Sequence, residues 1–196
     1  MEFGHIRRMN DTRFPHEIAV ILPGEYFVSD SPMVVYTVLG SCISVCLRDP
    51  FAKVGGMNHF MLAVPAGEHT NDAWAESGRY GSYAMEMLIN GILSRGGHKN
   101  RLEAKVFGGG KIYDSANNIG AKNAAWALDF LEQEGLAPVK ADVGDVCPRK
   151  VYYFTESGRV LLKRLDQVQS RTIVKEEQRY QSTLQQAPPA GEVTLF

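Results

Sequence analysis

The chain has few cysteines, no long apolar run and almost no net charge. Its three cysteines among 196 residues are an odd, sparse set, which does not fit the disulfide framework of a small secreted domain. No apolar stretch approaches the roughly 20 residues that a membrane-spanning helix needs, and the opening segment MEFGHIRRMNDTRF lacks the apolar core of a signal peptide. We therefore expect free thiols, no membrane insertion and a cytoplasmic location.

The charge pattern argues against a polyanionic partner. The formal net charge is −1, and the lysines and arginines are scattered rather than gathered into blocks, so nucleic acid is not expected to bind. The glycine-rich stretch FGGGKIYDS resembles a phosphate loop but lacks its glycine spacing and the hydroxyl residue after Lys111. Four histidines lie in polar stretches without the spacing of metal ligands: His5, His16, His69 and His98. We expect neither a metal nor another cofactor.

The hydrophobic pattern predicts an α/β domain. With 44% hydrophobic residues, the chain is long enough to bury one core. Short β-branched runs broken by turn residues predict strands, and apolar residues at helical spacing predict helices over 73–97 and 117–135. The segment 137–145 predicts a short strand, and 149–165 predicts a hairpin that turns at Glu156-Ser157-Gly158.

The domain carries an extension at each end. Residues 1–16 are polar and unpatterned, and we assign the domain itself to residues 17–165. The remaining residues, 166–196, are rich in glutamine and then contain proline and glycine. This composition predicts a loosely attached helix followed by a mobile tail.

Two cysteines and one histidine gather in the segment CISVCLRDPFAKVGGMNHFML, which predicts a β-hairpin. If the turn is centred between Pro50 and Phe51, Cys42 faces His59 across the antiparallel ladder, close enough for a thiol to approach an imidazole. Such a pair is the minimal unit of cysteine catalysis, because imidazolium stabilises the thiolate and can later protonate a leaving amine. Cys42 is therefore a candidate nucleophile and His59 a candidate base.

Packing is the competing interpretation of these cysteines. A lone cysteine on a strand is most often a small core residue, and we expect this role for Cys46. A zinc site formed by Cys42, Cys46 and His59 is disfavoured, because two strand cysteines four residues apart are separated by about 13 Å.

The residues that precede Cys42 favour catalysis. Gly40 permits a sharp bend, and exposed backbone N–H groups near Ser41 can hold a developing oxyanion, so both are candidate substrate-binding residues. Thr37 is close enough in sequence to orient the imidazole, although its spacing alone favours an ordinary strand residue.

The segment TVLGSCISVCLRDPFAKVGGMNHFML resembles the signature of CheD, the bacterial chemoreceptor glutamine deamidase family. The similarity continues through KVFGGGKIYD, NIGAKNAAWALDFLEQEG and RKVYYFTESGRVLLKRL and covers about residues 17–165. It implies an α/β sandwich of mixed, largely antiparallel sheet flanked by helices, similar to the deamidating bacterial cytotoxins. It also implies a Cys-His-Thr catalytic set of Cys42, His59 and Thr37, with Tyr36 as the alternative third position.

The resemblance implies an activity and two partners. Glutamine side chains on chemoreceptor helices would become glutamates through a thioester on Cys42, with release of ammonia, during chemotaxis adaptation. A CheC-type phosphatase is the second implied partner and competes with the receptor. Because the implied site precedes residue 60, the segment after Gln167 is not expected to be needed for the chemistry.

Two other functions remain open at this point. One is a noncatalytic adaptor that binds receptor or phosphatase helices while Cys42 is buried. The other is a cysteine peptidase or transglutaminase-like acyltransferase, which shares the nucleophile.

Overall fold

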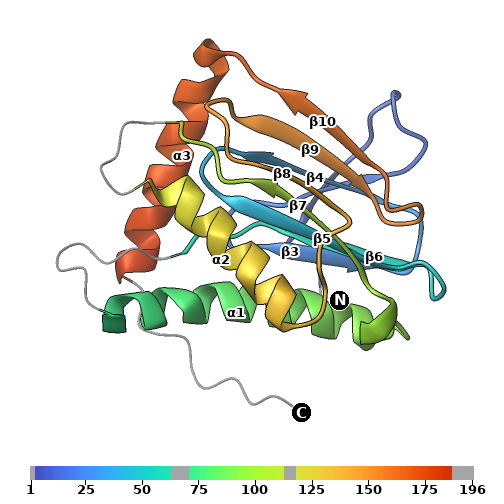
Figure 1. The fold of residues 1–196 in the computed structure, drawn as a ribbon. Coiled ribbons are helices and arrows are strands. Elements are labelled where there is room, and N and C mark those ends of the chain that lie inside the picture. The colour runs from blue at the N-terminus through green and yellow to red at the C-terminus, as the bar shows by residue number, and fades with distance from the viewer. Residues whose placement is uncertain (1–2, 63–70, 113–117, 187–196) are drawn as a thin grey trace.

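The computed structural model describes residues 3–62, 71–112 and 118–186. Within these ranges, ten strands form two five-stranded sheets, and two helices pack on the second sheet (Figure 1). The predicted α/β sandwich is therefore confirmed. His69 and residues 187–196, the end of the segment 166–196 for which a helix and a mobile tail were predicted, lie outside the described residues.

The first sheet has the strand order β1-β2-β4-β9-β10. Its strands are β1 (Arg7–Met9), β2 (Ile18–Val20), β4 (Val34–Leu39), β9 (Arg149–Phe154) and β10 (Val160–Arg164). The second sheet has the order β3-β6-β5-β7-β8. Its strands are β3 (Tyr26–Ser29), β5 (Ile43–Asp49), β6 (Val54–Asn58), β7 (Glu103–Gly108) and β8 (Lys140–Val143). The helices are α1 (Asn71–Leu93), α2 (Ile119–Gln133) and α3 (Gln167–Gln186), with a short 3-10 turn at Lys99–Arg101.

Both sheets are mixed but largely antiparallel, as predicted. β2 runs parallel to β4 in the first sheet, and β7 runs parallel to β8 in the second. The other neighbouring strands pair antiparallel, including the predicted final hairpin of β9 and β10.

The alternation of side chains along β5 divides them between two cores. Ile43, Val45 and Leu47 belong to the core between the second sheet and the helices α1 and α2. Cys42 and Cys46 belong to the core between the two sheets. Cys42 lies where the chain crosses from the end of β4 in one sheet to the start of β5 in the other.

The predicted hairpin of β5 and β6 forms, but its register was predicted wrongly by two residues. Asp49 pairs with Val54, so the turn is one residue further along the chain than expected. The Asp49 carboxylate accepts two backbone N–H groups inside the turn, and Lys53 closes it with φ 57. A shift of two residues keeps every side chain on its face, so Cys42 and His59 are diagonal neighbours rather than direct partners.

The two predicted domain helices also form. On α1, Tyr83 is 44% exposed, whereas Met85 is fully buried. The N-terminal segment, which has no strand pattern, contributes β1 to the edge of the first sheet. Its Ile6 is buried in the core between the sheets.

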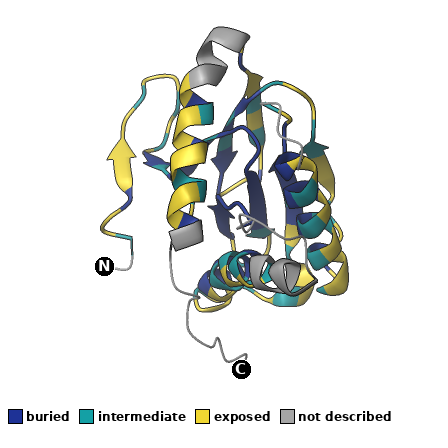
Figure 2. Cartoon of the chain, turned by 90° about the vertical axis from the view of Figure 1, so that its left-hand side faces the viewer, coloured by how far each residue is buried: buried dark blue, intermediate teal, exposed yellow. Residues whose placement is uncertain are grey.

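Helix α3 crosses one end of the sandwich (Figures 1 and 2). Its outward side is exposed, while Ile173, Glu177 and Leu184 are buried. A glutamate is rarely buried unless its charge has partners, and the partners of Glu177 lie in the site beneath α3.

Among the described helices, none is both long and apolar enough to cross a membrane.

Candidate active site

The site lies on the crossover from β4 to β5 and draws on both sheets. Thr37 stands on β4, Cys42 directly precedes β5, and His59 directly follows β6. Glu177 reaches them from the middle of α3. All four side chains are at most 2% exposed.

Three consecutive backbone carbonyls of the crossover are anchored by hydrogen bonds from the glycine loop and from α2. A glycine loop at residues 108–110 donates one N–H to the carbonyl of Gly40 (2.7 Å) and another to that of Cys42 (2.8 Å). The side-chain amide of Asn123 donates to the carbonyl of Ser41 (2.8 Å). The peptide planes of the crossover are therefore fixed by groups from outside it.

The glycine loop has to be glycine because it lies so close to the crossover. A Cβ on Gly108 would stand 2.1 Å from the carbonyl oxygen of Cys42, and its φ of +114 is a conformation that other residues rarely adopt. The run that resembles a phosphate loop in the sequence thus supports the backbone around the thiol.

The backbone N–H groups of Gly40, Ser41 and Cys42, which we call the cradle, converge on one carboxylate. Glu177 Oε1 accepts the N–H groups of Gly40 (2.8 Å) and Cys42 (3.2 Å). Its Oε2 accepts the N–H of Ser41 (2.9 Å) and the Ser41 hydroxyl (2.6 Å). The cradle is therefore a site built to hold negative charge, as an oxyanion hole must be.

The imidazole of His59 is held in one tautomer. The Thr37 hydroxyl lies 2.8 Å from the carbonyl oxygen of Ile21 and 2.7 Å from His59 Nδ1. Since a carbonyl only accepts, the single hydroxyl proton goes to Ile21, and Nδ1 must donate its proton to Thr37. His59 Nε2 then carries a lone pair, and it has no hydrogen-bond partner among the described residues.

The structure distinguishes Thr37 from Tyr36, the two candidates for the third member of the implied catalytic set. Tyr36 lies in the outer cluster of the first sheet, where its ring centroid is 4.6 Å from that of Tyr152. Thr37, its neighbour, points between the sheets and contacts His59. Strand alternation thus places Thr37 rather than Tyr36 at the imidazole.

The thiol and the imidazole are both neutral in this arrangement. Burial raises the pKa of the Cys42 thiol, and the Glu177 carboxylate raises it further through its charge and a hydrogen bond. Burial lowers the pKa of His59 to about 3. The thiolate–imidazolium pair expected from the sequence is therefore absent, because the site is closed to water and holds a carboxylate.

The other two cysteines lie outside this cluster. Cys46, on the same face of β5, is 1% exposed in the core between the sheets, where it was expected. Burial raises its pKa as well. Cys147 is half-buried and, like Cys42 and Cys46, forms no disulfide.

The same cluster contains residue types that bind metal. Cys42 Sγ, a His59 ring nitrogen and a Glu177 carboxylate oxygen lie within 4.8 Å of one another. However, Glu177 already accepts the three N–H groups of the cradle and the Ser41 hydroxyl, besides its hydrogen bond with the Cys42 thiol, and a carboxylate has only about four lone-pair sites. Donors that point at a carboxylate in this way favour an anion over a cation.

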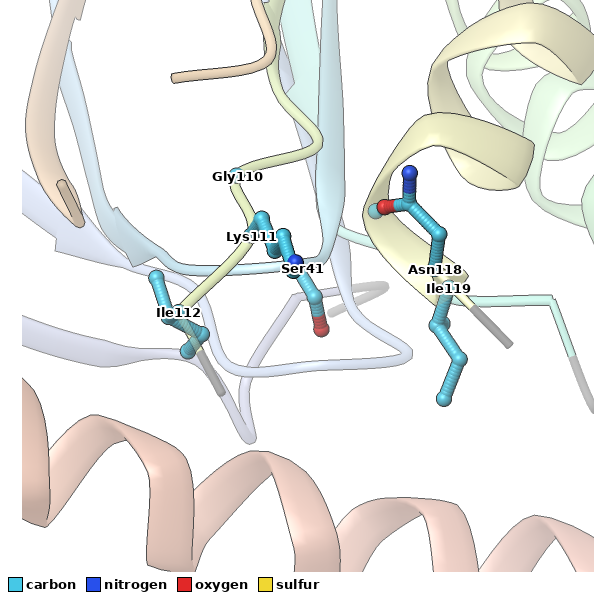
Figure 3. A pocket seen from close by; sticks show the side chains of 7 residues that line it. Ser41, Gly110, Lys111, Ile112, Asn118 and Ile119 are labelled. Atoms are coloured by element: carbon cyan, nitrogen blue, oxygen red, sulfur yellow. The ribbon is translucent and has the colours of Figure 1, made fainter. Parts of the chain in front are cut away.

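A small hollow lies beside Ser41, between the glycine loop and the first turn of α2 (Figure 3). Gly110, Ile112 and Asn118 line it, and α3 passes nearby.

Two members of the site have no counterpart in the sequence prediction. Asn123 lies within a helix whose pattern indicates only packing, and Glu177 lies in a polar helix more than 130 residues from the cradle. The single available signal for Glu177 is its position between the apolar residues Ile173 and Leu184 on one helical face.

Comparisons with known proteins identify the family. A family model described as CheD chemotactic sensory transduction matches residues 61–164. Curated relatives named probable chemoreceptor glutamine deamidase CheD include those of Thiobacillus denitrificans, 50% identical over 95% of this chain and 93% of the relative, and Methylobacillus flagellatus, 47% identical over 95% and 93%. The relative of that name from Halorhodospira halophila is 42% identical over 99% of this chain and 91% of its own. This chain belongs to the CheD family.

Proposed function

We propose that this chain is a protein-glutamine deamidase that converts glutamine side chains of bacterial chemoreceptors to glutamate. The observation that carries the proposal is the convergence of a thiol, an imidazole with a free lone pair and an anion-binding cradle. The names of the curated relatives supply the substrate class. A cytoplasmic location and a role in chemotaxis adaptation are part of the proposal.

The first half of the reaction forms a thioester. His59 Nε2 takes the proton from the Cys42 thiol as sulfur bonds to the side-chain amide carbon of the glutamine. The amide oxygen becomes an oxyanion, to which the cradle donates its N–H groups. The imidazolium then gives its proton to the departing nitrogen, the C–N bond breaks and ammonia leaves.

The second half of the reaction regenerates the thiol. His59 takes a proton from water as the water oxygen bonds to the thioester carbon, and the cradle again holds the oxyanion. The C–S bond then breaks, and the imidazolium returns its proton to the leaving sulfur, which gives the glutamate product, the Cys42 thiol and neutral His59. Thr37 serves this cycle by keeping the proton on Nδ1, which leaves the Nε2 lone pair free to act as the base.

The proposal is tested with the purified chain and the cytoplasmic fragment of a chemoreceptor. Peptide mass spectrometry should find glutamines converted to glutamates, with one ammonia released for each conversion. Binding of the fragment without conversion would favour the adaptor. Cleaved peptide bonds, or incorporation of an added amine, would favour the peptidase or the acyltransferase.

A CheC-type phosphatase is proposed as a second partner, on the strength of the family resemblance. If it shares the receptor surface, adding it should slow receptor deamidation in proportion to its bound fraction. Binding that leaves the deamidation rate unchanged would place it on another surface.

A further inference from the structure

We propose that α3 occupies the binding site of the substrate helix, with Glu177 in the position of the reacting side chain as a built-in mimic of the product. This inference rests on the proposed function, because it identifies the ligand of the same site. A glutamate is what a glutamine becomes in the reaction, and α3 presents one to the nucleophile from the middle of a helix.

The contacts of Glu177 are those that the cradle would make with the carboxylate product of the reaction. Its two oxygens accept all three N–H groups of the cradle and the Ser41 hydroxyl. A carboxylate oxygen also lies within 4.8 Å of both Cys42 Sγ and a His59 ring nitrogen. While Glu177 holds the cradle, no other carbonyl group can use it.

Apolar contacts on either side hold the helix over the site. Tyr180 packs against the core between the sheets, and a Cβ on Gly24 would stand 2.6 Å from its hydroxyl oxygen. Leu184 belongs to the same core, and Ile173 is buried one turn before Glu177. The rest of the described face of α3 is largely exposed, as Figure 2 shows.

This spacing describes the substrate that fits in place of α3. The fitting ligand is an α-helix whose glutamine has apolar side chains four residues before it, three after it and seven after it, matching Ile173, Tyr180 and Leu184. A substrate of this kind must displace α3, so the closed chain is the resting form. Its neutral thiol agrees with that role.

Glu177→Gln provides the sharpest test, because it turns the mimic into a substrate. Cys42 Sγ should bond to the carbon of the introduced side-chain amide, the C–N bond should break, and ammonia should leave with a proton from His59. Water then cleaves the thioester, which restores glutamate at position 177 and the free thiol. Peptide mass spectrometry of the purified full-length variant should find mostly glutamate at this position.

Two matched variants control for spontaneous deamidation. Glu176→Gln places the same amide on the exposed side of the same helix and should keep it. The double variant Cys42→Ala/Glu177→Gln should keep the amide at position 177. Equal conversion with and without Cys42 would overturn the proposal, since no active site would then be involved.

The apolar spacing is tested in the same background. Tyr180→Ala combined with Glu177→Gln should slow the conversion at least tenfold, whereas Arg179→Ala, on the exposed side, should leave it unchanged. Equal conversion in both double variants would overturn the proposed spacing.

A readout that does not depend on turnover separates this inference from the proposed function. Glu177→Ala should speed iodoacetamide labelling of Cys42, followed at the peptide level, at least tenfold over wild type and over Glu176→Ala. A matching thermal transition for the three proteins would show that all are folded.

The two readouts together distinguish the ways in which the inference can fail. Labelling of Glu177→Ala at the wild-type rate, with the amide of Glu177→Gln unconverted in a chain that still deamidates receptor, would overturn the role of α3 and leave the proposed function intact. Accelerated labelling with that amide unconverted would reduce α3 to a shield and overturn the substrate assignment.

Discussion

A buried carboxylate lies at each end of β5, and the two are held in different ways. Asp49, within the strand, accepts N–H groups from its own turn and from His98, and it forms a salt bridge with Arg101 (2.7 Å). Glu177, at the other end, arrives from a helix 135 residues further along the chain than Cys42. Its hydrogen-bond donors are backbone N–H groups and one hydroxyl.

The difference separates a carboxylate that builds the fold from one that occupies a site. The donors of Asp49 lower its pKa, and a local turn depends on it. The donors of Glu177 belong to a crossover that is already anchored by the glycine loop and Asn123, so we expect the cradle to keep its shape without Glu177. Burial and hydrogen bonding alone therefore do not distinguish a structural carboxylate from a bound ligand, whereas the origin of the donors does.

The largest expected effect is on the rate of receptor deamidation, at Cys42 next to the start of β5. Cys42→Ala should reduce receptor deamidation by at least about 10³-fold, because one sulfur carries the covalent step. Cys46→Ala, on the same strand face, should keep most of the activity. Both rates are measured by ammonia release, and an essential Cys46 with a dispensable Cys42 would contradict the assignment.

At the other end of β5, Asp49 should contribute to the free energy of unfolding. Asp49→Ala should lower the free energy of unfolding by about 3 kcal/mol, because buried N–H groups and Arg101 lose their partner. Glu177→Ala should cost clearly less, since α3 can lift and admit water to the cradle. Urea unfolding of both variants measures this, and equal losses would remove the distinction between the two carboxylates.

A third prediction concerns pH. Burial lowers the pKa of His59 to about 3, below its ordinary 6.5. Between these two pH values the imidazole is protonated in the unfolded chain but not in the folded chain. Stability is therefore lost as the pH falls from 6.5 toward 3. Between pH 7 and pH 5, wild type should lose about 2 kcal/mol more than His59→Gln in urea unfolding. Parallel losses in the two proteins would show that the imidazole is open to solvent.

The smallest effect concerns the hydroxyl that orients the imidazole. Thr37→Val should lower kcat about tenfold, because Nδ1 loses its acceptor and the productive tautomer is no longer enforced. Thr37→Ser should restore most of the rate. A valine variant with the full rate and an unchanged pH profile would remove Thr37 from the site.

The sequence predicted the pairing of Cys42 with His59 despite a wrong register. Strand faces repeat every two residues, so a two-residue error in the turn left both side chains on the same face. The error arose because the Asp49 carboxylate caps a longer turn than Asp-Pro alone indicates. Thr37 was predicted only from the family resemblance, with Tyr36 as the alternative, and the alternation of side chains along β4 in the structure separates the two.

Glu177 could not be predicted in the same way. Its contact with the cradle spans more than 130 residues, and a polar, glutamine-rich helix predicts loose attachment rather than a buried charge. The glycine loop was likewise recognisable only as a loop, because the need for glycine comes from the carbonyl of Cys42, which is distant in the sequence.

The central claim, that Cys42 forms a thioester with a receptor glutamine, is tested most directly by trapping that intermediate. Wild-type protein turning over a receptor fragment is quenched with acid, digested and analysed by mass spectrometry. We predict a Cys42 peptide joined to a receptor glutamine peptide with the loss of one ammonia, absent in Cys42→Ala. A thioester on Cys46 or Cys147, or conversion of receptor glutamines that continues in Cys42→Ala, would contradict the account.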